Sequence, residues 1–245
     1  MLQQTQVSRV LPAYATFLRR FPTLAVLSRA PLGDVLRAWS GLGYNRRARD
    51  LHRIARLNPR SLPETRAGLD SLPGVGPYTA GAVSCFSRGE SVAFADTNIR
   101  RVLGRALLGR IATEREAIAL DERLVPGRRA DRWHHALMDL GATVCLARTP
   151  RCDVCPIAVG CRSRGRVVRA APRRQAAFAT SDRRVRGRIV AQLREGDGMT
   201  LRALTARLGD ARVPQLARTL ADEGLLEIER GRVRLPETES AVNGR

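Results

Sequence analysis

Lysine is missing from this chain of 245 residues, and all 43 of its lysine-or-arginine positions hold arginine. Covalent catalysis through a lysine amine is therefore excluded. The chain also lacks a run of about 18 apolar residues, which a membrane-spanning helix requires. Its first residues lack the basic-then-apolar pattern of a secretory leader. We therefore expect a cytoplasmic protein that has no membrane partner.

Acidic residues are scarce as well: 23 stand against the 43 arginines, which gives a net charge of +20. A field of this sign and size attracts polyanions and speeds their capture. Nucleic acid is therefore the favoured partner. The alternative is a basic surface that has no function.

Four of the five cysteines lie close together, as Cys145-x6-Cys152-x2-Cys155-x5-Cys161. Four thiolates at unequal spacing in one loop can surround a compact metal centre. A zinc ribbon normally has two tight Cys-x2-Cys pairs, and an odd cysteine total without a leader opposes disulfides. The spacing favours a [4Fe–4S] cluster over zinc or unligated thiols. Cys85 lies in an apolar run and is expected to be a buried small hydrophobe.

Helical periodicity dominates residues 1–162. Apolar residues between 7 and 18 recur every three or four positions, as one buried helix face requires. Few runs favour strands, so the large domain is predicted to be all-α. Further helices are expected over 44–57, 64–71, 77–87, 97–109, 114–125 and 130–144.

The pattern changes after residue 162. Ten arginines and a single acid, Asp182, occupy residues 162–188, which indicates a solvated linker that leads into a basic helix. Arg230-Gly231 lies between two short strand-forming runs, which is a hairpin signal. Three short helices followed by a hairpin outline a winged-helix module. The helices are expected over 182–194, 200–208 and 212–223.

Leu72-Pro73-Gly74-Val75-Gly76-Pro77-Tyr78 lies between two predicted helices. Its two glycines let the backbone turn tightly and approach a ligand closely, and Pro77 suits the first position of a helix. The amides at that helix start form a phosphate site that is independent of base sequence. This is the pattern of a helix-hairpin-helix, although Gly-x-Gly between helices is often only a turn.

Asp96-Thr97-Asn98 follows an apolar run and precedes a helix that contains three arginines. Asp96 suits the N-cap of that helix. The alternative is a functional carboxylate that faces a cleft and stabilises a developing cation. The helix dipole and the arginines would keep it ionised at neutral pH.

Six motifs occur in a characteristic order. They are Met1-Leu2-Gln3-Gln4-Thr5-Gln6-Val7, Gly41-Leu42-Gly43-Tyr44, residues 72–80, Asp96-Thr97-Asn98, Met138-Asp139-Leu140-Gly141-Ala142 and the four cysteines. Together they resemble the adenine DNA glycosylases of the endonuclease III-like, helix-hairpin-helix superfamily, from residue 1 to about 162. The resemblance implies an all-α helix-hairpin-helix DNA glycosylase fold with an iron–sulfur cluster loop. It also implies removal of adenine paired with 8-oxoguanine or guanine in double-stranded DNA, by a monomer.

The resemblance also assigns residues. Asp96 would stabilise the oxocarbenium sugar and help to deliver water, Asn98 belongs to the same catalytic motif, and Tyr78 would shape the pocket. The four cysteines would bind the cluster. The DNA contacts would comprise Gln4 and Tyr44 as wedges, Thr5 and Leu42 near 8-oxoguanine, the backbone amides of Gly74, Val75 and Gly76, and Arg148 and Arg151 on the cluster loop.

Tyr78 occupies the place where strand-cutting relatives carry a Schiff-base lysine. Because no lysine exists elsewhere in the chain, we expect a monofunctional glycosylase. The general acid of the resembling family is a glutamate two residues before the position of Met1. Glu64 and Glu90 do not occupy equivalent positions. The chain as written is therefore expected to be amino-terminally truncated and impaired, with a misassigned start as the favoured reason.

The expected organisation ends with a small C-terminal winged-helix-like α+β module, which is too short for the nucleotide-hydrolase-like domain of many relatives. It would be either a second DNA contact or a structural cap. Two other functions stay open, a mismatch glycosylase for thymine in G·T pairs and a non-catalytic cluster-containing regulator. The expected domains are 1–97 (helical barrel with the hairpin), 98–162 (cluster), 163–181 (arginine-rich linker), 182–236 (winged-helix-like) and 237–245 (disordered tail).

Overall fold

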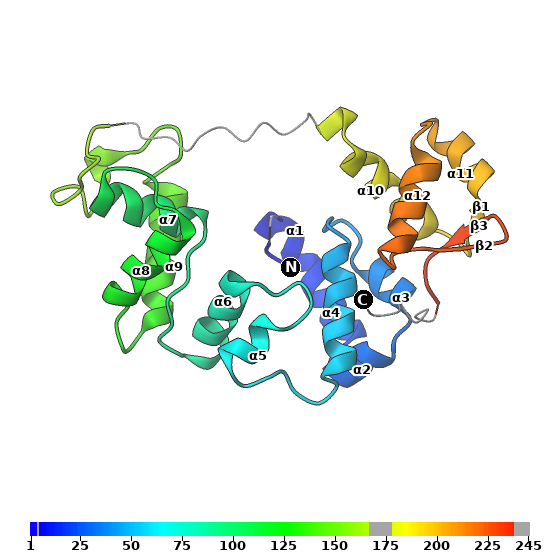
Figure 1. Cartoon of the computed structure of the whole chain (residues 1–245), viewed down its shortest axis with the longest axis horizontal. Helices are drawn as coiled ribbons and strands as arrows, with labels where there is room; N and C mark the ends of the chain where they lie inside the picture. Colours follow the sequence, from blue (N-terminus) through cyan, green and yellow to red (C-terminus); the bar gives the residue numbers. More distant parts are fainter. Residues whose placement is uncertain (4, 167–177, 238–245) are drawn as a thin grey trace. The chain divides into compact units, whose positions relative to one another are not determined.

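The computed structural model describes residues 1–3, 5–166 and 178–237 (Figure 1). Gln4, most of the expected linker and most of the expected tail lie outside the described residues. Two compact units form. Unit 1 combines residues 1–62 with the described C-terminal residues 178–237, and unit 2 comprises 63–166. The domain boundary expected after residue 97 stays a prediction.

Unit 2 is helical, as predicted. Its helix ends follow local signals. Pro77 starts α6, Gly89 ends it in the left-handed conformation, and Thr113 and Glu116 form a capping box at the start of α8. Buried side chains of α7 and its neighbours, among them Phe94 and Ile99, form the core. The elements are α5 (Arg66–Asp70), α6 (Pro77–Arg88), α7 (Thr97–Leu103), η1 (Gly104–Leu108), α8 (Glu114–Leu124), α9 (Ala130–Thr143) and η2 (Cys152–Val154).

The helix expected over 97–109 changes character in its second half. After α7 the chain continues as η1, a π-helical segment. Gly104 explains why this segment packs closely, because a Cβ there would lie 2.3 Å from the Ala112 nitrogen and 2.5 Å from the Arg110 oxygen. Glycine alone lets the returning backbone pass so near the helix.

Unit 1 contains the first four helices and the C-terminal elements. The three C-terminal helices agree with the sequence prediction to within a residue or two at each end. The elements are α1 (Val7–Arg20), α2 (Leu24–Arg29), α3 (Leu32–Ala38), α4 (Arg46–Leu57), η3 (Phe178–Thr180), α10 (Asp182–Leu193), β1 (Met199–Thr200), α11 (Leu201–Leu208), α12 (Val213–Asp222), β2 (Glu227–Glu229) and β3 (Arg232–Arg234).

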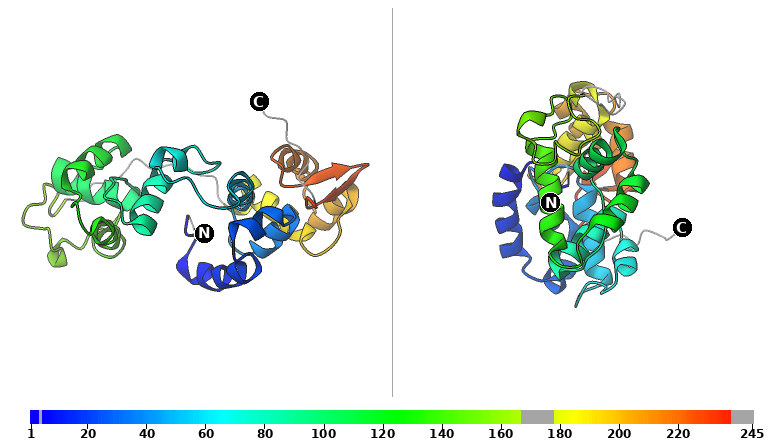
Figure 2. Two further views of the ribbon diagram at one scale, coloured as in Figure 1. Left: turned by 90° about the horizontal axis from the view of Figure 1, so that it is seen from below. Right: turned by 90° about the vertical axis from the view of Figure 1, so that its left-hand side faces the viewer.

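The strands of unit 1 form a three-stranded antiparallel sheet in the order β1-β3-β2. The predicted hairpin of β2 and β3 is present, and Figure 2 shows it beside the C-terminal helices. Arg230 and Gly231 form its turn with φ values of 47° and 77°, and two positive values are the mark of a type I′ turn. β1 has only two residues, too few to produce a periodic sequence signal.

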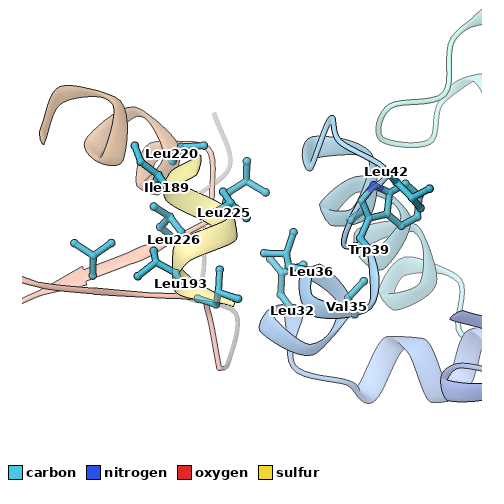
Figure 3. Close-up of a cluster of buried hydrophobic side chains, with 14 of the residues drawn as sticks. Leu32, Val35, Leu36, Trp39, Leu42, Ile189, Leu193, Leu220, Leu225 and Leu226 are labelled. Carbon is cyan, nitrogen blue, oxygen red and sulfur yellow. The ribbon is translucent and has the colours of Figure 1, made fainter. Parts of the chain in front are cut away.

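The C-terminal elements share one hydrophobic core with the N-terminal helices. Figure 3 shows Leu32 and Leu36 of α3 pointing toward Leu193 of α10. The Gly33 amide donates to the Pro236 carbonyl at 2.7 Å, and a Cβ on Gly33 would lie 2.9 Å from that oxygen. Only glycine permits this approach, so the sequence of α3 fits the C-terminal segment that covers it. No helix in the described part of the chain is long and apolar enough to cross a membrane.

Candidate active site

The loop between α5 and α6 forms the turn that the sequence predicted. Gly74 has a φ of 71°, a conformation that favours glycine, and the Val75 amide donates to the Leu72 carbonyl at 3.1 Å. Gly76 is the N-cap of α6, and an added Cβ there would meet no atom within 4 Å. Open space therefore adjoins the backbone where the first amides of α6 begin.

Asp96 caps the start of α7. Its Oδ1 accepts hydrogen bonds from the amides of Asn98 at 2.8 Å and Ile99 at 2.7 Å, and its Oδ2 accepts one from the Asn98 side chain at 3.1 Å. The capping interpretation is therefore confirmed. Because the cap fixes the carboxylate, Asp96 has a defined orientation and stays half-buried. Capping and a second role as an oriented negative charge are compatible.

Tyr78, on the first turn of α6, lies near Asp96. Its ring meets Phe94 edge-on at 5.7 Å between centroids. Burial and the negative charge of Asp96 both raise the pKa of the Tyr78 phenol. Tyr78 is therefore a neutral hydroxyl at neutral pH.

Arg101 connects this motif to the first cysteine, and sequence reasoning missed it. One of its guanidinium nitrogens, Nη2, donates to the Asn98 side chain at 2.7 Å and to the Gly141 carbonyl at 2.6 Å, while Nε donates to the Cys145 carbonyl at 2.7 Å. A Cβ on Gly141 would lie 2.6 Å from the Cβ of Asn98. The glycine of the 138–142 motif is thus explained by close packing against Asn98. Contacts run from Asp96 through Asn98 and Arg101 to the cysteine loop.

All four predicted ligand cysteines line one pocket of unit 2. They are free thiols and half-buried. Arg105, which is only 2% exposed, fixes the loop that starts at the first of them, because it donates to the carbonyls of Leu146 at 2.7 Å and Ala147 at 3.0 Å. Its Nη1 also lies 3.4 Å from the Cys145 sulfur. Buried arginine is uncommon without such partners.

The donor set fits an iron–sulfur cluster. Four thiols around one pocket are the ligand type and number that a [4Fe–4S] cluster takes. No group of three His, Cys, Asp or Glu side chains placed to hold a metal ion is found among the described residues, so the cluster stays a prediction. In a [4Fe–4S] cubane each thiolate binds a different iron, so its ligands surround a pocket. Arg148 and Arg151, on the loop between the first two cysteines, are exposed and form no ion pair in the described part of the chain.

In unit 1, Arg47 organises the loop that holds the other predicted contacts. Its Nη2 donates to the Thr5 hydroxyl at 3.0 Å and to the Leu42 carbonyl at 3.1 Å, and its guanidinium lies over the Tyr44 ring at 5.4 Å. Tyr44 has a φ of 48° and is exposed. The Leu42 side chain is buried in the core. Arg47 was missed because nothing distinguishes it among the arginines of the 44–57 segment.

The remaining candidates are placed as follows. His134 is buried between the Asp121 carboxylate, at 2.7 Å, and the Ala130 carbonyl, at 2.8 Å, while His135 stacks on Phe86. Neither Glu64 nor Glu90 bonds to Asp96 or Tyr78 within the described residues; Glu90 lies 3.9 Å from Arg88. Cys85 is buried, as expected.

The helical fold, the glycine hairpin and the capped aspartate define a class of DNA repair proteins. The model of the HhH-GPD superfamily base excision DNA repair proteins matches residues 1–126. The chain is 43% identical over 214 residues to an adenine DNA glycosylase of Mycobacterium tuberculosis, with 83% of this chain and 70% of that protein covered. It is 38% identical over 177 residues to the human adenine DNA glycosylase, with 68% of this chain and 32% of that protein covered.

Solved structures agree at the level of the fold. A thermostable thymine-DNA glycosylase is 28% identical with a TM-score of 0.61, and the match covers 66% of this chain and 79% of that one. An endonuclease III in a non-covalent DNA complex is 24% identical with a TM-score of 0.60, which shows the fold alone; coverage is 66% and 78%. The chain belongs to the HhH-GPD superfamily and, within it, to the adenine DNA glycosylases, which are base-excision repair enzymes that hydrolyse N-glycosidic bonds.

Proposed function

We propose that the protein removes adenine mispaired with 8-oxoguanine or guanine, and that it does so by hydrolysis alone. The observation that carries this proposal is the Asp96 carboxylate, which the start of α7 orients beside the neutral phenol of Tyr78. A base inside a duplex must be extruded before its sugar bond can be attacked. The extruded nucleotide would present its sugar to this carboxylate.

Asp96 acts on the charge that develops during the reaction. As the bond between the sugar C1′ and the adenine nitrogen breaks, its electrons leave with the base and the sugar becomes cationic. A fixed negative charge stabilises this cation without reorganisation. Water supplies the hydroxyl that adds to C1′ and the proton that the adenine carries away. Tyr78 shapes the pocket, and Asn98 holds the carboxylate through its side-chain amide.

The proposed DNA contacts involve the exposed backbone of the turn before α6 and the loop that Arg47 holds in place. In the turn Gly74-Val75-Gly76, the amides of Gly74 and Gly76 would bind a phosphate, while the Val75 amide already donates to the Leu72 carbonyl. The open space at Gly76 supports this role. Tyr44, exposed and covered by the Arg47 guanidinium, would wedge into the duplex together with Gln4. Thr5 would lie near the opposite base; the Leu42 side chain is buried, so Leu42 would approach that base only through its backbone. The protein would act on mismatched or oxidised duplex DNA as a monomer.

A [4Fe–4S] cluster held by Cys145, Cys152, Cys155 and Cys161 completes the proposal. The pocket that these thiols line and the carbonyl contacts of Arg105 support it. The cluster would give its loop a fixed shape and so present Arg148 and Arg151 to the DNA backbone. Purified protein should absorb at about 400 nm and contain about four irons per chain. Stoichiometric zinc in place of iron would refute the cluster.

The C-terminal module of unit 1 is proposed to be winged-helix-like. Its elements follow the order α10-β1-α11-α12-β2-β3, with a helix-turn-helix and then a hairpin. This connectivity extends the outline that the sequence predicted. The packing of α10 on α3 supports a role as a structural cap as well.

Base release from three duplexes tests the function. Matched duplexes with A·8-oxoguanine, A·G and T·G pairs are incubated with the chain described here and, if the reading frame continues upstream of Met1, with the longer product. Abasic sites should form in the adenine strand of the first two, and the chain as written, which is expected to be impaired, should form them more slowly than the longer product. Preferential release of thymine would instead favour a glycosylase for thymine in G·T pairs. The similarity to the structure of a thymine-DNA glycosylase supports this second candidate. Binding without any base release by the longer product would favour the regulator.

A further inference from the structure

The C-terminal module contains a helix-turn-helix that the proposed chemistry does not use. α11 ends at Gly209, which has a φ of 60°, and a four-residue turn over 209–212 leads into α12. Two helices joined by such a glycine-containing turn are a recurrent DNA-binding arrangement, in which the second helix enters the major groove.

The second helix has one buried and one free face. The buried face is apolar and belongs to the core of unit 1, with Val213, Leu216, Ala217 and Leu220. The opposite face carries Gln215, Arg218, Thr219 and Asp222, which recur at helical spacing and are all exposed. Glutamine and arginine are the side chains that form paired hydrogen bonds with the major-groove edges of adenine and guanine.

The hairpin tip lies beside the first helix of this motif. The Leu201 amide at the start of α11 donates to the Gly231 carbonyl at 2.9 Å. The two bonded residues directly adjoin, in the chain, Arg230 at the tip and Arg202 in the first turn of α11. Arg230 adopts a left-handed conformation that suits asparagine or glycine better. An arginine kept at an unfavourable backbone position is most simply explained by its exposed charge.

The same surface continues to the second helix. Arg202, Thr205 and Ala206 of α11 line a shallow, open depression together with Pro214 of α12. Hairpin tip, first helix and start of the second helix therefore adjoin one another. We call this surface, defined by residues 202–206, 214–219 and 230–232, the module face.

Charge on the module face is left unbalanced. Some arginines of the module are neutralised, since Arg212 pairs with Asp182 and Asp210, and Arg234 pairs with Glu227 and Glu229. By contrast, none of the cations Arg202, Arg218 and Arg230 has an acidic partner in the described part of the chain. Three exposed guanidinium groups without an acidic partner complement a phosphate backbone.

We propose that the module face is a second DNA-binding surface, which holds duplex DNA apart from the mispair. α12 would enter the major groove, and Arg202 and Arg230 would contact phosphates on its flank. This proposal and the proposed function both require duplex DNA as the partner, but the module face takes no part in base release. It assigns the module both of the roles considered above, a second DNA contact and a structural cap.

The test removes the three charges from the full-length protein. The variant combines Arg202→Gln, Arg218→Gln and Arg230→Asn, and asparagine suits the first position of the type I′ turn. A matched control combines Arg29→Gln, Arg115→Gln and Arg123→Gln, three exposed arginines that have no ion pair within the described residues. Both variants lose the same charge. Affinity for a fluorescent, undamaged duplex is measured by anisotropy across a salt series.

The module-face variant should bind about tenfold or more weakly at about 0.1 M salt. Its plot of log affinity against log salt should be flatter by about 0.9 for each lost phosphate contact. The control should stay within about twofold of the wild type. Each of Arg218→Gln and Arg230→Asn alone should show a smaller loss in the same direction. These single variants decide the matter if the triple variant melts at a lower temperature.

The proposal would be overturned if the module-face variant bound DNA as tightly as the wild type, or if the control variant lost as much affinity. The module face would then have a structural role or bind a protein. Failure of the proposed function is distinguishable, because it is read from base release by the wild type. A wild type that binds undamaged duplex through the module face but releases no adenine would contradict only the proposed function.

Discussion

Asp96 performs two tasks with different requirements. Capping α7 requires one side-chain oxygen that accepts backbone hydrogen bonds, and Oδ1 supplies it. Stabilising a sugar cation requires a full negative charge. The two requirements can therefore be separated by a substitution that keeps the oxygen and removes the charge.

Asp96→Asn should separate them. Asparagine is as good an N-cap as aspartate, so the bonds to the α7 amides should be kept, and only the bond from the Asn98 side chain should be lost; the melting temperature should therefore fall less than in Asp96→Ala. Base release under single-turnover conditions should fall by a factor of about 100 or more, because the charge that stabilises the transition state is lost. Asp96→Ala serves as the comparison and should also lower stability by about 1 kcal/mol. Unchanged base release in Asp96→Asn would eliminate Asp96 as the electrostatic catalyst.

Tyr78 gives a second residue-scale prediction, at alkaline pH. Its pKa in the folded protein is raised by burial and by Asp96, whereas the unfolded chain has an ordinary tyrosine. Above a pH of about 10 the unfolded state releases the proton first, so the free energy of unfolding falls as pH rises. Tyr78→Phe should flatten this fall in urea titrations between about pH 9 and 11. An identical pH profile in the two proteins would show that the phenol is not held in this environment.

At the scale of elements, the C-terminal end of α12 is bound to α4 through Glu223. Its carboxylate forms ion pairs with Arg46 of α4 and Arg186 of α10, and the Arg49 side chain donates to its backbone carbonyl. Burial acts to raise the pKa of Glu223, but the hydrogen bonds from Arg46 and Arg186 outweigh it and hold the pKa at about 2. One side chain thus connects three helices of unit 1.

The low pKa of Glu223 predicts acid sensitivity of this junction. A carboxyl with a depressed folded pKa stabilises the fold above its unfolded value of about 4.5, and this stabilisation is lost as pH falls toward 2. Glu223→Gln should lower the free energy of unfolding by about 2 kcal/mol at pH 7 and by little near pH 2. Chemical denaturation at both pH values measures this. A difference that is equal at the two pH values would contradict the ionic origin.

Local signals predicted most elements, and long-range packing explains what they missed. Pro77, Gly89 and the Thr113 capping box mark helix ends within a few residues, so they are visible in the sequence. The approach of Gly33 to Pro236 joins positions about two hundred residues apart and has no local signature. At the site, the Asp96 cap was predictable from spacing. Arg47 and Arg101 were not, because their importance comes from the carbonyls that they reach.

At the scale of the whole molecule, the absence of lysine from this sequence means that no surface of the chain carries a lysine amine for Schiff-base chemistry. Strand cleavage through a Schiff base requires a primary amine that attacks the sugar C1′. No side chain in this sequence supplies one, and Tyr78 occupies the position next to Asp96 where such an amine would act. The chain should therefore leave an intact strand with an abasic site, cut only after alkali is added.

Borohydride trapping makes this prediction measurable. Wild-type protein incubated with an A·8-oxoguanine duplex and borohydride should give no covalent complex on a denaturing gel. Tyr78→Lys should give one, because it places a primary amine near the Asp96 carboxylate, within reach of the same sugar carbon. Arg115→Lys, at an exposed position on α8, provides a matched lysine away from the site and should not trap. A covalent complex formed by the wild type would contradict monofunctional hydrolysis. A complex formed equally by both lysine variants would mean that trapping does not report on this site.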